Sequence, residues 1–131
     1  MIVDSSAIVA MLKNEPEAEM FGAAILAVTK PIMSAGNYLE ASIVIDRDRD
    51  PDQSAALDIV LTELAVQIVP VTPSQAKIAR QAYRDFGKGS GHPARLNFGD
   101  CFAYALATER GEPLLYKGDD FANAGLARIV A

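Results

Sequence analysis

The stretch Leu96-Asn97-Phe98-Gly99-Asp100-Cys101-Phe102-Ala103-Tyr104-Ala105-Leu106-Ala107 predicts the start of a helix that presents an acid. Its apolar residues recur at helical spacing, and Asn97 is a residue type that caps a first turn. Asp100 falls in that first turn, where free backbone N–H groups and the helix dipole favour an ionised carboxylate. A carboxylate held there is suited to bind a cation, especially if other acids of the chain lie nearby.

The overall composition favours one domain in a reducing compartment. Of the 131 residues, 50% are hydrophobic, which is enough for a core. No apolar run approaches the roughly 20 residues that span a bilayer, and Met1 does not open a signal peptide, so we expect no membrane segment. The single cysteine, Cys101, excludes an internal disulfide and is typical of the cytoplasm. The net charge of −5 disfavours a nucleic-acid binder unless divalent cations offset the acids.

Short apolar segments alternate with longer helical patterns along the chain. The expected strands are 1–4, 30–34, 66–71, 112–116 and 128–130. The expected helices are 5–12, 16–28, one around 38–44, 53–64, 72–86, 98–107 and a short turn at 122–126. This alternation predicts an α/β fold with a parallel sheet. The charged run 46–52 predicts a solvated connection.

Several acids follow predicted strands. Asp4 ends the first strand, Glu40 lies about one helical turn past the second, and the pair Asp119 and Asp120 follows 112–116. The carboxyl ends of parallel strands share one edge of a sheet, so these acids would approach Asp100. Clustered carboxylates need a cation to stay ionised, and oxygen ligands suit Mg²⁺ or Mn²⁺. The matching chemistry is phosphodiester hydrolysis by water that a cation activates.

A basic, glycine-rich loop at 87–95 leads into the Asp100 helix. Its glycines do not match a phosphate-binding loop, and no strand precedes them. Lys88 and Arg95 are either contacts for a polyanionic substrate or ordinary solvated residues. His92 is the only histidine, which leaves little basis for a histidine zinc site or a catalytic triad.

Four motifs in this order resemble the PIN domain, and more narrowly the VapC-type ribonuclease toxins of bacterial toxin–antitoxin pairs. The motifs are IVDSSA at 2–7, YLE at 38–40, LNFGD at 96–100 and PLLYKGDDF at 113–121. The resemblance covers essentially the whole chain as a single PIN domain, 1–131. It implies a three-layer α/β/α sandwich with a central, mostly parallel sheet.

The same resemblance implies an Mg²⁺- or Mn²⁺-dependent endoribonuclease. Its substrate would be RNA, with tRNA and rRNA as candidates, and its partners a VapB-type antitoxin that inhibits it and a second copy in a homodimer. By matching position, the catalytic and metal-binding acids would be Asp4, Glu40 and Asp100, with Ser6 supporting them.

The fourth acid departs from the family pattern. Many members carry Thr-x-Asp after the last apolar strand, whereas this chain has Tyr116-Lys117-Gly118. The acid is displaced by one residue to Asp119, which Gly118 would let reach the cluster. Asp119 is the preferred fourth acid, and Asp120 is the alternative.

Two other functions stay open at this point. A weakly catalytic PIN-like module that acts mainly through a partner protein would fit the acidic charge and the departure at Gly118. A phosphoacceptor of the receiver type would use Asp4 or Asp119 with Mg²⁺, and would need a lysine at a late strand end. Lys117 is the one candidate for that lysine.

Overall fold

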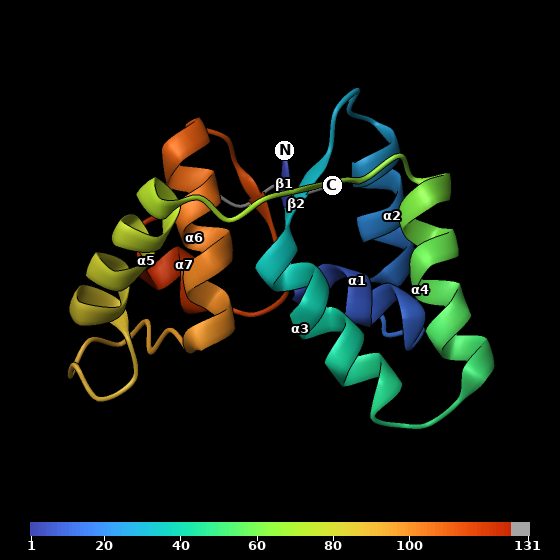
Figure 1. Cartoon of the computed structure of the whole chain (residues 1–131), viewed down its shortest axis with the longest axis horizontal. Helices are drawn as coiled ribbons and strands as arrows, with labels where there is room; N and C mark the ends of the chain where they lie inside the picture. The colour runs from blue at the N-terminus through green and yellow to red at the C-terminus, as the bar shows by residue number, and fades with distance from the viewer. Residues whose placement is uncertain (127–131) are drawn as a thin grey trace.

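The computed structural model describes residues 1–126, which form three layers (Figure 1). The middle layer is a sheet of four parallel strands in the order β3-β2-β1-β4. The strands are β1 (Ile2–Val3), β2 (Ile32–Ser34), β3 (Gln67–Val69) and β4 (Leu114–Leu115). The predicted α/β sandwich with a parallel sheet is therefore confirmed.

Helices cover both faces of the sheet (Figure 1). One side carries α1 (Ser5–Leu12), α2 (Ala18–Leu26), α3 (Ala35–Asp46) and α4 (Pro51–Glu63). The other side carries α5 (Pro73–Phe86), α6 (Phe98–Arg110) and the short α7 (Asp120–Asn123). No helix within residues 1–126 is long and apolar enough to cross a membrane.

The two faces of the sheet bury separate cores because successive strand side chains point to opposite sides. Toward α1–α4 point Val3, Met33 and Leu115, which pack with Ile8 and Phe21. Toward α5–α7 point Ile2, Ile32 and Leu114, which pack with Leu96, Leu106 and Tyr116. Burial on both faces explains why the strands are continuous apolar runs rather than alternating ones.

Local capping chemistry sets most helix starts. Thr72 caps α5 and Asn97 caps α6, as predicted. Asp50 caps α4, with Pro51 at the first helical position, so this helix begins two residues before the predicted 53. The helix predicted from Pro16 begins at Ala18 instead, after a turn in which the Ala18 N–H donates to the Glu15 carbonyl.

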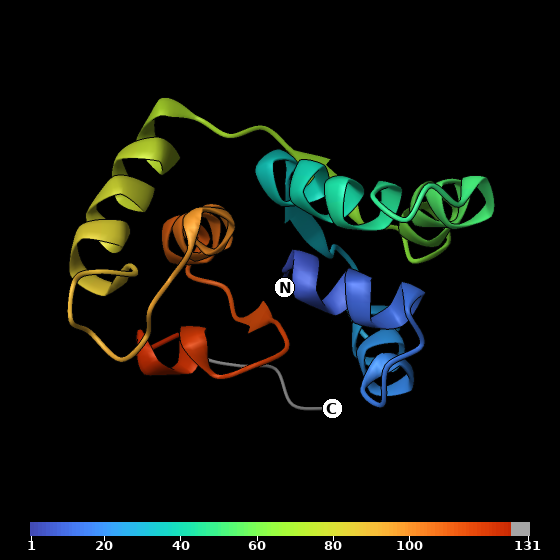
Figure 2. The ribbon, with the colours of Figure 1, turned by 90° about the horizontal axis from the view of Figure 1, so that it is seen from below.

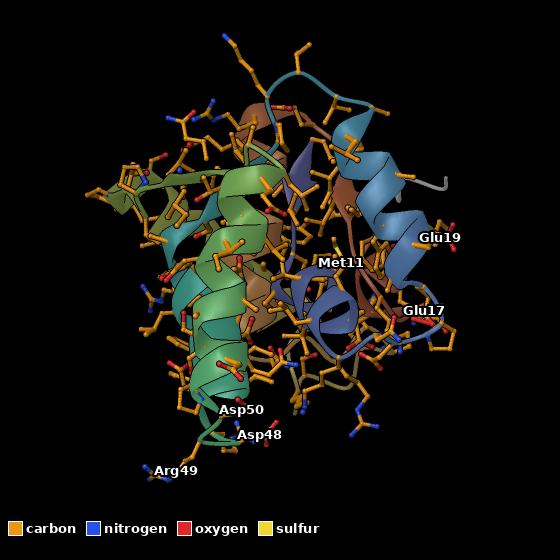
Figure 3. The ribbon with its side chains drawn as sticks, turned by 90° about the vertical axis from the view of Figure 1, so that its right-hand side faces the viewer. Met11, Glu17, Glu19, Asp48, Arg49 and Asp50 are labelled. Carbon is orange, nitrogen blue, oxygen red and sulfur yellow. The ribbon has the colours of Figure 1, made fainter. Side chains whose placement is uncertain are left out.

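The remaining differences are small. The charged run 46–52 is exposed throughout, and Figure 3 shows Asp48, Arg49 and Asp50 at the turn between α3 and α4, at the edge of the molecule. Its two ends belong to the flanking helices rather than to the connection. The turn predicted at 122–126 is α7 at 120–123. The strand predicted at 128–130 lies outside the described residues.

One edge of the sheet gathers the segments of interest. β1 runs into α1, β2 runs into α3, and β4 runs into the turn before α7, all at the carboxyl ends of the strands. Figure 2 is seen from this side, with α6 nearly end-on beside the starts of α1 and α3. In open α/β sheets this is the edge where functional groups meet.

Candidate active site

Asp4 lies in the interior at the end of β1. It is the N-cap of α1, and one carboxylate oxygen, Oδ2, accepts a hydrogen bond from the Ser6 N–H at 3.0 Å. Asp4 is only 2% exposed. The other carboxylate oxygen, Oδ1, is buried without a hydrogen-bond partner. Burial raises the pKa of Asp4 to about 7, although the hydrogen bonds from Ser6 act in the opposite direction.

Glu40 lies on α3 and is held by neighbours on two helices. The Ser5 hydroxyl at the start of α1 donates a short hydrogen bond to Glu40 Oε1. The Asn37 amide, one turn earlier on α3, donates to the same oxygen at 3.2 Å. Glu40 is therefore not the solvated surface acid that its position on a helix would suggest on its own.

Asp100 closes the first turn of α6. The Asn97 side chain accepts from the Asp100 N–H at 2.8 Å, while Asp100 Oδ2 accepts from the Asn97 N–H at 2.9 Å, which is a reciprocal capping box. Burial raises the pKa of Asp100 to about 6, and the Asn97 hydrogen bond only partly offsets it. The helix start was expected to favour an ionised Asp100 carboxylate, and burial acts against that preference by raising the pKa.

The three predicted acids act on one another. The charges of Asp100 and Glu40 both raise the pKa of Asp4, and the charge of Glu40 raises that of Asp100. Asp4 after β1, Glu40 on α3 and Asp100 in the first turn of α6 are therefore close enough at the carboxyl edge of the sheet for their charges to interact. Mutual repulsion of this kind is relieved when a cation binds between the carboxylates.

The fourth acid comes from the turn after β4. Gly118 has φ +97°, a left-handed conformation that glycine adopts without strain, and it redirects the chain into α7. Asp119 is the N-cap residue of α7, and Asp120 is its first residue. The charge of Asp120 contributes to the raised pKa of Asp100. Asp119 and Asp120 therefore both follow the turn at Gly118, where the fourth acid was predicted.

Ser6 connects this corner to Asp4. Its N–H and hydroxyl both hydrogen-bond the Asp4 carboxylate, and its Oγ accepts from the Lys117 N–H at 3.0 Å. The Lys117 ammonium pairs with Glu15 at 2.8 Å and Glu17 at 2.9 Å, on the segment that leads into α2. Figure 3 labels Glu17 and Glu19 near the start of α2. The Lys117 ammonium is therefore engaged by Glu15 and Glu17.

The donor set fits a hard divalent cation. All candidate ligands are carboxylate oxygens, and Asp4 Oδ1 is a buried oxygen atom without a hydrogen-bond partner, which a cation could bind. Within residues 1–126, however, no three such side chains are gathered tightly enough to hold an ion by themselves. A site of this kind suits Mg²⁺ or Mn²⁺, which keep several water and phosphate oxygens as ligands.

The basic loop supplies one charge that acts on Asp100. The positive charge of Lys88 acts on Asp100 and partly offsets the rise in its pKa. His92 instead has a local role: its ring packs edge-on against Phe86 with centroids 4.9 Å apart, and its Nδ1 accepts from the Ala94 N–H. Lys88 thus acts on the candidate site through its charge, whereas His92 contributes to the structure of the loop.

The sequence reasoning missed the residues around the Glu40 carboxylate. Asn37 lies three positions before Glu40, on the same face of the helix, and is fully buried. Gly99 interrupts a good helical pattern directly before Asp100, which is a signal of close packing. Ser5 lies directly after Asp4, and its contact with Glu40 on another helix has no signal in the sequence.

Comparisons with known proteins give the family. The PIN domain model matches residues 1–126. Ribonuclease VapC28 of Mycobacterium tuberculosis is 52% identical over 130 residues, covering 99% of this chain and 98% of the relative. The fold is similar to that in the crystal structure of Mycobacterium tuberculosis VapC20, a sarcin–ricin loop cleaving toxin, with TM-score 0.77, 17% identity, and coverage of 99% and 98%. It is also similar to a chain in a toxin–antitoxin complex from Klebsiella pneumoniae, with TM-score 0.68, 15% identity, and coverage of 92% and 89%.

The family match spans every element that supplies a candidate acid, from β1 to α7. The match to VapC28 extends over nearly the full length of both chains. The chain therefore belongs to the PIN domain family, in the group of the VapC ribonucleases.

Proposed function

We propose that the protein is a divalent-metal-dependent endoribonuclease and the toxin of a type II toxin–antitoxin pair. The observation that carries the proposal is the group of Asp4, Glu40 and Asp100 at one edge of the sheet, in which Asp4 keeps a buried oxygen without a partner. Relatives named as ribonucleases support the reaction class.

Asp4, Glu40 and Asp100 would hold Mg²⁺ or Mn²⁺, together with one acid of the Asp119 and Asp120 pair. When bound, the cation supplies Lewis acidity toward water and the scissile phosphate. Asp4 would bind the cation from the protein interior, because this residue is only 2% exposed. Asp119 stays our preferred fourth acid, and the charge that Asp120 exerts on Asp100 keeps Asp120 as the alternative.

RNA would approach from the side of the basic loop. Lys88 carries a positive charge close enough to Asp100 to affect its pKa, so a phosphate bound there would lie beside the acids. Nucleic-acid affinity is dominated by such contacts to the backbone phosphates. The proposal covers RNA as a class, including tRNA and rRNA, and places the activity in the cytoplasm.

A VapB-type antitoxin would hold the enzyme inactive, as expected for a chain of this group. The proposal also includes a homodimer through an apolar surface formed by Leu39 and Ile43 on α3 and by Phe98 on α6. These side chains are 60%, 53% and 78% exposed, and all three line one cleft between α3 and α6. Phe98 also lines a second cleft between α5 and α6. Contiguous exposed apolar patches of this kind are typical of protein interfaces.

The test is cleavage of structured RNA by the purified protein, freed of any partner, in Mn²⁺ and in EDTA. We expect cleavage only with the metal, and a loss of about 100-fold or more in Asp4→Asn and in Asp100→Asn. Asp48→Asn is the matched control, since it removes the same charge from an exposed turn between α3 and α4. Cleavage that persists in EDTA, or in both site variants, would refute the proposal.

A further inference from the structure

We propose that Asn37 and Gly99 are positioning residues that fix the Glu40 carboxylate against the first turn of α6. They would hold Glu40 in one geometry relative to Asp100 before a cation binds. The inference rests on the proposed function in one respect, namely that Glu40 is a metal ligand. The structural part of the inference can be tested separately.

Asn37 joins the two helices that carry Glu40 and Asp100. Its side chain is fully buried, and its Nδ2 donates both to Glu40 Oε1 at 3.2 Å and to the Gly99 carbonyl at 2.9 Å. Both partners are acceptors, so the amide must present its N–H groups to them. One buried amide therefore fixes the Glu40 side chain and the α6 backbone relative to each other.

Gly99 supplies the space that this arrangement needs. A Cβ at this position would lie 1.6 Å from Glu40 Oε2 and 2.2 Å from its Cδ, so the carboxylate occupies the place of a side chain. A glycine inside a helix destabilises the helix relative to alanine, so Gly99 needs a reason. Gly99 does not have a left-handed backbone that would require glycine. The reason is the close approach of Glu40.

Ser5 completes the contacts to the carboxylate. Its hydroxyl donates to Glu40 Oε1 from the start of α1, one residue after Asp4. The Glu40 head group is thus held by α1, α3 and α6 together. Neighbours that orient a ligand in this way are generally worth about 10- to 100-fold in metal affinity.

The first experiment measures Mn²⁺ affinity by isothermal titration calorimetry. We expect about a 10-fold or greater loss in Gly99→Ala and in Asn37→Ala. The matched control is Gly22→Ala on α2, where the added Cβ would meet only Met11 Cε, at an ordinary 3.5 Å. Unchanged Mn²⁺ affinity in Gly99→Ala would overturn the proposal.

A double-mutant cycle separates positioning from general damage. If Gly99→Ala acts by displacing Glu40, it causes no further loss of Mn²⁺ affinity in a Glu40→Ala background. Equal losses in the two backgrounds would overturn the proposal, because the alanine would then act independently of Glu40.

Thermal unfolding in EDTA gives a readout that needs no metal and no RNA. Gly99→Ala should lower the melting temperature in the wild-type background, since Glu40 loses its hydrogen bonds to Ser5 and Asn37. In the Glu40→Ala background the same change should raise it, because alanine favours the helix. A shift of the same sign and size in both backgrounds would overturn the positioning role. A wild-type protein that binds no Mn²⁺ would refute the proposed function instead, and the thermal cycle would still decide the positioning role.

Discussion

Replacing Asp4 with asparagine should stabilise the protein in EDTA while removing its response to metal. Burial raises the pKa of Asp4 from 3.8 to about 7, so the folded protein binds this proton more tightly than the unfolded chain does. The contribution of Asp4 to stability therefore falls as pH rises from about 4 to 7 and is then level, because this residue binds fewer protons in the unfolded state throughout that window. The difference of about 3 pKa units corresponds to about 4 kcal/mol at pH 8 as an upper value.

Asparagine has nearly the same shape and can still accept from the Ser6 N–H, but it carries no charge to bury. We expect Asp4→Asn in EDTA at pH 8 to gain up to about 4 kcal/mol in the free energy of unfolding, and to gain little at pH 4. The assay is urea unfolding between pH 4 and 8.5, with Asp48→Asn as the control for loss of a surface charge. The charges of Asp100 and Glu40 act on Asp4, so the difference between the two proteins reports the Asp4 carboxyl together with its coupling to these acids.

Metal narrows the difference in stability between the two proteins at pH 8. At an Mn²⁺ concentration 100 times its dissociation constant, the wild type should gain about 2.7 kcal/mol and Asp4→Asn should gain much less. The reasoning is refuted if Asp4→Asn is no more stable than the wild type at pH 8 in EDTA. It is also refuted if the pH dependence of stability is the same in both.

Other local features give independent predictions. Asn97→Ala removes the cap of α6 and should cost about 1 kcal/mol in urea unfolding; no loss would mean that the capping box contributes nothing. Burial raises the pKa of Cys101 to about 11, so the thiol should react with a disulfide reagent much more slowly in native protein than in urea, and equal rates would contradict its burial. Phe98→Ser should shift the protein toward monomer in light scattering without unfolding it, since the ring is 78% exposed; an unchanged mass would refute the proposed dimer surface. Lys88→Ala should raise KM for RNA and reduce its salt dependence, and an unchanged KM would exclude a phosphate contact there.

The fold was predictable from the sequence because its signals are local. Thr72 with Pro73 marks the start of α5, and Asn97 marks that of α6, since each cap needs only a short polar side chain before a helical pattern. The strands were predictable as short apolar runs, although each strand is shorter than the predicted run. Asp50 caps α4 in the same way, but it lies within a charged run whose composition predicts a solvated connection.

The site was predictable only in part. Asp4, Glu40 and Asp100 were predicted from their places after a strand, one turn past a strand and at a helix start, and the resemblance assigned them a metal-binding role. The Glu40 contacts could not be predicted, because Ser5, Asn37 and Gly99 come from three helices and meet only in the folded chain. The raised pKa values of the acids also depend on burial, which no local pattern reports.

The choice between Asp119 and Asp120 depends on one backbone turn at Gly118. A shift of one residue there changes which carboxylate enters the site, and sequence spacing does not decide between them. Asp119 therefore stays a prediction, as do the single domain over 1–131 and the cytoplasmic location.

The most direct test of the central claim is a crystal structure of the protein soaked in Mn²⁺, with the ion located by its anomalous signal. We predict a peak bound by Asp4 Oδ1, with Glu40 and Asp100 as further ligands and one carboxylate of the Asp119 and Asp120 pair facing it. A structure at saturating Mn²⁺ with no peak among these three acids, or with the ion only at surface acids such as Glu15 and Glu17, would contradict the account.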